Sequence, residues 1–460
     1  MKELTKSGNW ISGLQWLFFI FTNIVVIPIT VGAAFGLSPE KIVSLLQLSF
    51  IVTGLACMLQ AFLGHHRALL EGQSGLWWGV ILTLVTTASA QGVPLTEVGG
   101  SLAIGVMISG VLTVLIGITG LGPYIAKMFS PGVMGVFMFL FATSLCGIFL
   151  KGMLGIPFGN AGKEASIDMP VAGLAIVIAI LVILISIKAP TSVRRYGLLI
   201  GIIVGWIVYT IIFGSDAAAG SSEGGGMSFE LYPFGKPIWN TGIIVTTVLA
   251  GLLNSANTFG ALKGTDEMYN QLTTNKQYRA SFSISGLVTI FSGFFGLVPY
   301  SPFVSSIGFL NQTGEIKRTP FILGGFMFFV MGIIPPVGHF FSLLPLSIGS
   351  AALFVSYLQI FNSSWRFFEQ VSFNTLNVYR AAIPLFTGLI VMTMPANFFA
   401  TMPDAIRPLI SNGLLVGIIL ALFMENLFPW DRLGTSEQQI KAKKLEEERL
   451  ARDRAALESN

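Results

Sequence analysis

Long apolar windows follow one another along almost the whole chain, separated by short charged or Gly/Pro-rich breaks. About 20 consecutive apolar residues are what an α-helix needs to cross the hydrocarbon core of a bilayer. The pattern predicts fourteen spans, near residues 12–36, 42–63, 72–90, 99–120, 125–150, 170–188, 197–213, 239–262, 280–297, 302–314, 320–338, 342–361, 380–396 and 408–428.

The composition agrees with a membrane protein. Of 460 residues, 53% are hydrophobic and 10% are charged, whereas a soluble domain carries about 25% charged residues. We therefore expect an all-α polytopic membrane protein and exclude a water-soluble enzyme. Walker-type loops, H-E-x-x-H motifs and metal-ligand clusters do not occur in the sequence, so neither a cofactor nor a metal is predicted. Cys57 and Cys146 lie in apolar runs and are interpreted as packing residues.

The loop charges predict the orientation. With the N-terminus inside, fourteen Lys and Arg residues fall on inner segments before the tail is counted, against five on outer segments: Lys41, Lys151, Lys163, Lys236 and Arg407. This positive-inside bias predicts a multi-pass protein of the cell (inner) membrane with both termini cytoplasmic. The net charge of +4 then reflects topology, and no nucleic-acid partner is predicted.

The chain divides into two halves. Residues 1–215 carry seven predicted spans, 216–236 form an outer linker, 237–430 carry seven more, and 431–460 form a charged cytoplasmic tail. The fifth and twelfth spans both open with Pro and Gly four residues apart, at Pro131 and Gly135 and at Pro345 and Gly349. Seven spans is an odd number, so equivalent helices run in opposite directions, which is the inverted repeat of many secondary transporters.

Two spans are interrupted near their beginning. Residues 71–75 precede the third span and residues 299–306 the tenth, and each leaves only a half-helix behind a short extended segment. Such backbone survives at membrane depth only inside protein or beside a watery cavity. The two half-helix N-termini would meet near the midplane, where their free N–H groups attract polar or anionic ligand atoms. The alternative is that Gly and Pro merely kink packed helices.

Uncharged polar residues inside apolar spans are further candidates. Asn254, Asn257 and Thr258 share one face of the eighth span, and Asn23 lies in the first. Amides on one face suit a ring edge that alternates N–H and C=O groups, but such residues also serve as hydrogen-bonded contacts between helices. The His65-His66-Arg67 run is interpreted as part of a basic inner loop.

Several motifs resemble the nucleobase-ascorbate (uracil/xanthine/purine) permease family and, more distantly, sulfate and bicarbonate transporters of the same fold. The resemblance extends from the first span to the last. It is carried by the segments 13–16 (GLQW), 25–28 (VVIP), 70–74 (LEGQS), 129–135 (FSPGVMG) and 299–318, in which Ile307-Gly308 and Thr313 have the spacing of the family's Y-x-E-N-I-G-x-x-x-x-T signature.

The resemblance implies a core domain (spans 1–4 and 8–11), which holds a base between the half-helices, and a gate domain (spans 5–7 and 12–14). The family's usual carboxylates fall on Asn254 and Ser305, and the Asn after the second falls on Ser306. Glu71, in place of a family Gln, is therefore the candidate proton carrier, with a role at the inner mouth as the alternative. The candidate substrate-binding residues are Asn23, Gln73, Gly75, Asn254, Asn257, Thr258, Tyr300, Val304, Ser305 and Ser306.

The resemblance and the polar pattern together predict a secondary active transporter for a nucleobase, either a purine or uracil/xanthine, working by alternating access with proton symport. Because the carboxylates are missing, a uniporter or a carrier of another small planar or anionic solute is the alternative within transport. A receptor or scaffold that does not transport is the alternative outside it. The family's gate domains associate, so the resemblance also implies that a homodimer can form in the bilayer.

Overall fold

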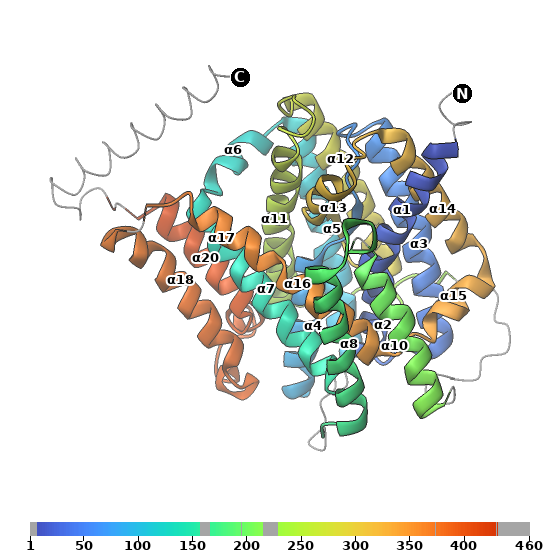
Figure 1. The fold of residues 1–460 in the computed structure, drawn as a ribbon. Coiled ribbons are helices and arrows are strands. Elements are labelled where there is room, and N and C mark those ends of the chain that lie inside the picture. The colour runs from blue at the N-terminus through green and yellow to red at the C-terminus, as the bar shows by residue number, and fades with distance from the viewer. Residues whose placement is uncertain are drawn as a thin grey trace.

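The structure is a computed structural model, described here for residues 7–156, 166–194, 196–214, 229–372, 374–428 and 430. Helices dominate it (Figure 1). The elements before the predicted linker are α1 (Ser7–Ile24), α2 (Val26–Ala34), α3 (Pro39–Phe62), β1 (Glu71–Gln73), α4 (Gly75–Ala90), α5 (Leu95–Thr119), α6 (Gly122–Met128), α7 (Pro131–Met153), α8 (Met169–Lys188), α9 (Thr191–Arg194) and α10 (Gly197–Phe213).

The elements after the linker mirror this order. They are α11 (Thr241–Gly264), α12 (Asn275–Phe295), β2 (Tyr300–Pro302), α13 (Ser305–Thr313), α14 (Arg318–Ile333), α15 (Pro335–Ser342), α16 (Leu346–Leu358), α17 (Ile360–Phe368), α18 (Thr375–Thr393), the 3-10 turn η1 (Ala396–Phe399), α19 (Arg407–Ile410) and α20 (Gly413–Asn426). In the first half the span formed by α1 and α2, followed by α3, precedes a strand and a half-helix, and in the second half α11 and α12 do so. The all-α polytopic fold is confirmed.

Local sequence fixes several helix ends. The Asn240 side chain accepts a hydrogen bond from a backbone N–H in the first turn of α11. α12 begins with a capping box, in which Thr274 and Gln277 satisfy each other's backbone N–H groups. The same helix ends at Gly296, whose φ of +67° is a conformation that glycine adopts without strain.

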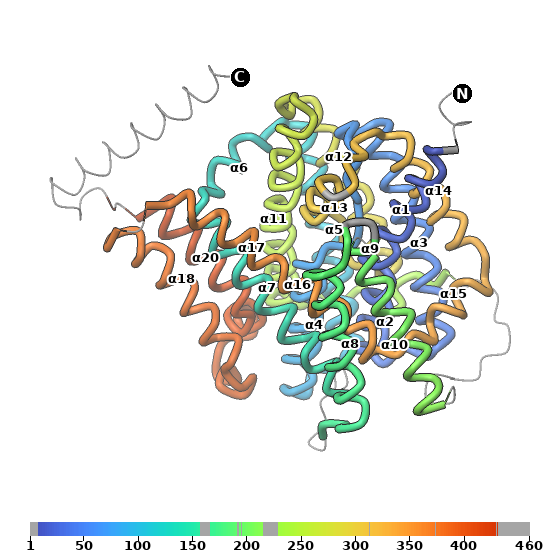
Figure 2. The backbone as a smooth tube through the Cα atoms, in the orientation of Figure 1, coloured from blue at the N-terminus to red at the C-terminus, as the bar shows by residue number. Residues whose placement is uncertain are grey.

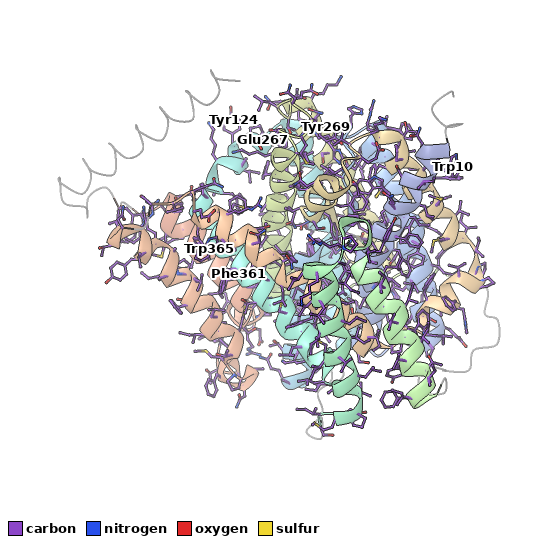
Figure 3. The ribbon with its side chains drawn as sticks, viewed as in Figure 1. Trp10, Tyr124, Glu267, Tyr269, Phe361 and Trp365 are labelled. Carbon is purple, nitrogen blue, oxygen red and sulfur yellow. The ribbon has the colours of Figure 1, made fainter. Side chains whose placement is uncertain are left out.

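Eight helices of the described chain are long and apolar enough to cross a membrane, or nine if α14 and α15 count as one span. Each predicted span contains a helix of the structure. The total of fourteen crossings stays a prediction, because shorter helices such as the nine-residue α13 fall outside that criterion. Exposed Trp10 and Tyr124 lie toward the end of the molecule where α1 begins (Figure 3), as aromatic residues of a membrane interface do.

The eleventh predicted span, 320–338, is wrong at its end. α14 stops at Ile333, and α15 turns away from it by 88°. Ile334 has an extended backbone with ψ 103°, because the residue before a proline is disfavoured in a helix, and Pro335 and Pro336 then start the new helix. Most of the predicted linker (216–228) and the whole predicted tail (431–460) lie outside the described residues.

Helix packing uses glycines at close contacts. α5 packs against α11 and α12, and α14 packs against α1 and α3. A side chain at Gly54 would collide with the α14 backbone at Gly325, and one at Gly110 would collide with the α12 backbone at Gly286. α7 packs against α16, α17, α18 and α20, while α8 packs against α10 and α16. Figure 1 places α18 and α20 on one flank of the molecule and α3 and α14 on the other.

Candidate functional site

The two interrupted spans meet at a short antiparallel strand pair. Gly72 of β1 lies opposite Ser301 of β2, and Gln73 lies opposite Tyr300. α4 begins at Gly75 directly after β1, and α13 begins shortly after β2. The extended segments and half-helices predicted from the sequence are confirmed. Figure 2 shows α13 toward the end of the molecule where α1 begins and α4 toward the opposite end, so their N-termini lie between the two ends.

An uncharged hydrogen-bond network joins α11 to both strands. Asn254 Oδ1 accepts a hydrogen bond from Ser74 Oγ at 2.6 Å and another from Asn257 Nδ2 at 3.0 Å. Asn254 Nδ2 donates to the Tyr300 carbonyl at 3.2 Å. Asn257 Nδ2 also lies 3.3 Å from Ser74 Oγ and 3.5 Å from Ser301 Oγ. One amide therefore connects α11 to the start of α4 and to the strand before α13.

The sequence placed Asn254, Asn257 and Thr258 on one face of α11, and the structure brings the two amides together. It did not single out Ser74 or Ser301, which complete the network. The signal that could have found Ser301 is the alternation of side chains along a strand, once Tyr300 is assigned to the opposite face. Thr258 is buried and lines a small cavity behind Asn254.

Two predicted site residues point away from this network. Gln73 Nε2 donates to Ser49 Oγ at 3.1 Å, and the Tyr300 hydroxyl is hydrogen-bonded to Thr53 Oγ1 at 3.0 Å. Ser49 and Thr53 both belong to α3. Residues directly opposite in an antiparallel pair present their side chains on the same face, so both side chains fasten the strand pair to α3.

Three further candidates have backbone or packing contacts. Ser306 Oγ accepts a hydrogen bond from the Leu70 N–H at 3.0 Å, which holds the start of α13 to the segment before β1. Asn23 Nδ2 donates to the Phe19 carbonyl of its own helix at 2.8 Å. Val304 lies against the α11 backbone. The structure brings none of these three side chains into the amide network.

The two half-helices differ in what covers them. A Cβ at Gly75 would lie 2.8 Å from the Phe141 ring and 2.9 Å from the Tyr357 hydroxyl, so the start of α4 is packed tightly against α7 and α16. Ser305 and Gly308 share one face of α13 and are both exposed, and a Cβ at Gly308 would meet nothing within 4 Å. The start of α4 is thus tightly covered, whereas this face of α13 is exposed.

The chemistry of the site is that of neutral donors and acceptors. In the described part of the chain, no group of three or more His, Cys, Asp or Glu residues is placed to hold a metal ion. Amides and hydroxyls can accept and donate at once, so the arrangement can bind a small polar ring through its edge.

The family model described as "Permease family" matches residues 8–397. The chain belongs to this permease family. YwdJ of Bacillus subtilis is 27% identical over 436 residues, covering 92% of this chain and 96% of the relative. The xanthine permease of the same organism is 23% identical, with 97% and 98% covered. The uric acid transporter UacT of Escherichia coli is 22% identical, with 91% and 85% covered.

Solved structures support the fold of the permease. The transmembrane domain of the cyanobacterial bicarbonate transporter BicA matches with a TM-score of 0.60 at 14% identity, covering 90% of this chain and 97% of that domain. SLC26A9 matches with a TM-score of 0.61 at 12% identity, covering 91% and 66%. The permease therefore has the inverted-repeat fold of these proteins. Its family and its relatives make it a membrane transporter and not an enzyme.

Glu71, the first residue of β1, is fully buried in the permease. Its Oε1 accepts a hydrogen bond from Ser285 Oγ at 2.6 Å, and its Oε2 accepts one from Gln60 Nε2 at 3.1 Å. None of the ion pairs among the described residues involves Glu71. The carboxyl group is therefore surrounded by neutral partners and, in this conformation, does not reach the mouth of the protein.

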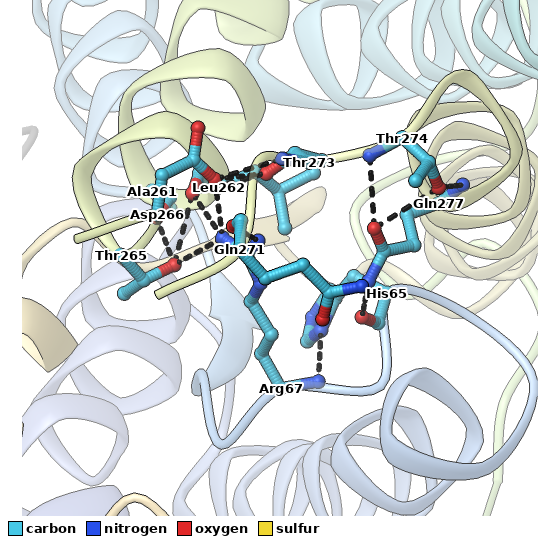
Figure 4. Close-up of polar contacts among 10 residues, drawn as sticks. All are labelled: His65, Arg67, Ala261, Leu262, Thr265, Asp266, Gln271, Thr273, Thr274 and Gln277. Atoms are coloured by element: carbon cyan, nitrogen blue, oxygen red, sulfur yellow. Dashed lines mark hydrogen bonds and ion pairs between the residues drawn. The ribbon is translucent and has the colours of Figure 1, made fainter. Parts of the chain in front are cut away.

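Arg67 lies in the segment between α3 and β1, where the sequence predicts a basic inner loop, and its side chain is buried. Its guanidinium donates to the Leu262 carbonyl, to Thr265 Oγ1, to the Gln271 carbonyl and to Asp266 Oδ1, the last at 2.8 Å (Figure 4). These contacts fasten the segment before β1 to the end of α11. No local pattern indicates these contacts, because Asp266 lies 199 residues further along the chain.

His65 sits beside this arginine and is fully buried. Its Nδ1 accepts a hydrogen bond from the Arg67 N–H at 3.1 Å, which leaves the ring proton on Nε2. Burial lowers the pKa of His65 to about 3, and the neighbouring Arg67 and His66 act in the same direction. The ring is therefore neutral at physiological pH and serves as a structural acceptor.

Proposed function

We propose that the permease carries a purine base of the xanthine or uric acid type across the cell membrane. Two of the reported relatives are named for these substrates. The observation that carries the proposal is the uncharged network around Asn254, at the point where both half-helices begin. A purine edge alternates N–H and C=O groups, which the Asn254 and Asn257 amides and the Ser74 hydroxyl can match.

Binding would replace the weaker contacts of the network. Asn257 Nδ2 shares its hydrogens among acceptors at 3.0, 3.3 and 3.5 Å, and the longest is at the limit of a hydrogen bond. A base that accepts a hydrogen bond from Asn257 Nδ2 would therefore displace only a weak contact. Asn254 and Asn257 each keep 8% of their surface exposed, so a ligand edge can approach both. Without a carboxylate, each bond contributes about 1 kcal/mol instead of the roughly 1.5–3 kcal/mol of a charged one.

Transport would proceed by alternating access. The helices that carry the network (α1–α5 and α11–α14) would form the core, and α7, α8, α10, α16, α17, α18 and α20 the gate. The tight contact of Gly75 with Phe141 and Tyr357, beside the exposed Ser305, corresponds to a state open on the side where α1 begins. The positive-inside bias supports a cytoplasmic location for that side and for both termini. A homodimer remains a prediction of the family resemblance.

Glu71 is the proposed carrier of a coupling proton, because it is a buried acid whose partners suit both protonation states. Gln60 Nε2 can only donate, whereas the Ser285 hydroxyl can donate to a carboxylate or accept from a carboxylic acid. A uniporter is the competing function, favoured by the absence of acids at Asn254 and Ser305.

The test is uptake of radiolabelled xanthine, uric acid, hypoxanthine, guanine and uracil into proteoliposomes, with and without an inward proton gradient. Uptake of a purine that the gradient accelerates is expected. Failure to move any of these bases would refute the nucleobase assignment, and purine uptake that ignores the gradient would leave uniport. The Glu71→Gln variant should still exchange base in counterflow but lose accumulation driven by the gradient.

A further inference from the structure

A small cavity lies behind Asn254, between α5, α11 and α12. Its lining includes Asn254 and Gly251 and the hydroxyl-bearing residues Ser109, Ser255 and Ser285. Its volume is about 10 Å³, which is about what the centre of one water molecule requires. A polar cavity of this size can hold one water that bonds to several of the surrounding groups.

Two observations show that the helix packing leaves this cavity and that its lining favours a polar occupant. A side chain at position 251 would collide with the Ser109 hydroxyl, so only glycine allows α5 to bring that hydroxyl to the α11 backbone. The Ser255 hydroxyl is buried and has no hydrogen-bond partner among the described residues. An unpartnered buried hydroxyl costs about 1–3 kcal/mol, so Ser255 favours a ligand, such as water, in the cavity.

The cavity also reaches Glu71 through one residue. Ser285 lines it and donates to Glu71 Oε1 at 2.6 Å. On its other side the cavity is bounded by Asn254, the centre of the amide network. The proposed proton site and the proposed base site are therefore separated by Ser285 and a space for one water.

We propose that Ser285 and a water in this cavity transmit the protonation state of Glu71 to Asn254, so that base affinity depends on it; this inference rests on the proposed function. An ionised Glu71 accepts a hydrogen bond from the Ser285 hydroxyl. Because Ser285 Oγ also accepts one from Gln60 Nε2 at 3.1 Å, only its remaining lone pair then faces the cavity. A protonated Glu71 donates its own O–H to Ser285 Oγ, which turns the Ser285 proton into the cavity. The water reverses its orientation and presents the opposite polarity to Asn254.

The other titratable groups near Glu71 do not take part in this relay from Glu71 through Ser285 to the water, because they are bonded to other partners. The Cys57 thiol of α3 donates to the Glu71 carbonyl at 3.4 Å, and the Tyr300 hydroxyl of β2 is bonded to Thr53. On α12 the groups that face Glu71 are the neutral hydroxyl of Ser285 and, through Gln60, the carbonyl of Ser281. Arg67 is occupied by its own partners at the end of α11.

The experiment measures the affinity of the purified full-length permease for tritiated xanthine as a function of pH. The pH dependence of affinity in the Glu71→Gln variant is the baseline, because in that variant xanthine still titrates but residue 71 does not. Relative to this baseline, wild-type affinity should change at least about fivefold across the pH range, as sites coupled by a typical allosteric free energy do. Ser285→Ala should follow the baseline within twofold, and Ser285→Thr, which restores a hydroxyl, should recover the wild-type dependence.

Ser281→Ala is the matched control. Ser281 lies one turn from Ser285 on α12, and in the part of the chain that the structure describes its buried hydroxyl has no hydrogen-bond partner, so this variant should behave like the wild type. A Ser285→Ala protein that keeps the full wild-type pH dependence would overturn the relay, as would a wild type that already follows the Glu71→Gln baseline. A wild type that binds no xanthine at any pH would instead count against the proposed function on which the relay rests.

Discussion

The packing of Gly75 against α7 and α16 provides a test of which conformational state of the transport cycle the structure represents. In Gly75→Ala the new Cβ would lie 2.8 Å from Phe141 Cζ, 2.9 Å from the Tyr357 hydroxyl and 3.2 Å from Leu145 Cδ1. Carbon atoms prefer separations of about 3.5–4.0 Å, and overpacking of this kind costs about 1–3 kcal/mol. The cost applies only while α4 is packed against α7, so the open state along α13 should lose about 5–150-fold in equilibrium population.

The exposure of Ser305 supplies the readout. A Ser305→Cys variant, in a Cys146→Ala background, should react with a membrane-impermeant maleimide applied to inside-out vesicles; Cys57 is fully buried and stays. Adding Gly75→Ala should slow this labelling several-fold or more. Gly79→Ala is the control, since its Cβ would meet only ordinary contacts at 3.4 and 3.6 Å. Equal labelling rates with and without Gly75→Ala would refute the assignment of the state.

Three further predictions concern the base site and its support. Asn254→Ala should weaken base binding about tenfold or more in equilibrium binding, through loss of several bonds of about 1 kcal/mol each; unchanged affinity would leave this residue as a structural contact. Arg67→Ala should lower the free energy of unfolding by about 3–5 kcal/mol, because the buried ion pair with Asp266 loses one partner. Arg407→Ala, at the more exposed ion pair with Asp404, should lower it by under about 1 kcal/mol. Equal shifts of the two variants in thermal unfolding would contradict this difference. The pKa of His65 is lowered to about 3, so the free energy of unfolding that the neutral ring contributes above about pH 6.5 should be lost as pH falls toward 3, by about 2 kcal/mol at pH 5. His65→Asn should flatten this pH dependence of thermal unfolding. An unchanged slope would argue against the role given to His65.

Much of the fold could be predicted because the bilayer constrains the backbone locally. Each membrane-spanning helix must satisfy its own hydrogen bonds, so apolar length and Gly/Pro breaks reveal the helices and the two interruptions. The face shared by Asn254 and Asn257 follows from helical periodicity alone. The bend at Ile334 was missed, although Pro335-Pro336 is a local signal, because the apolar pattern continues through it.

Only the tertiary structure decided where the polar side chains point. β1 and β2 lie more than 200 residues apart in the chain, and their register turns Gln73 and Tyr300 toward α3 while leaving Ser301 near Asn257. The burial of Arg67 and the link from Glu71 to Ser285 likewise depend on segments distant in sequence. The sequence by itself determined the helices, the interruptions and the neutral character of the site, because these follow from local composition and periodicity. Which side chains meet was decided by long-range strand pairing and helix packing, which a single sequence does not encode in any local pattern.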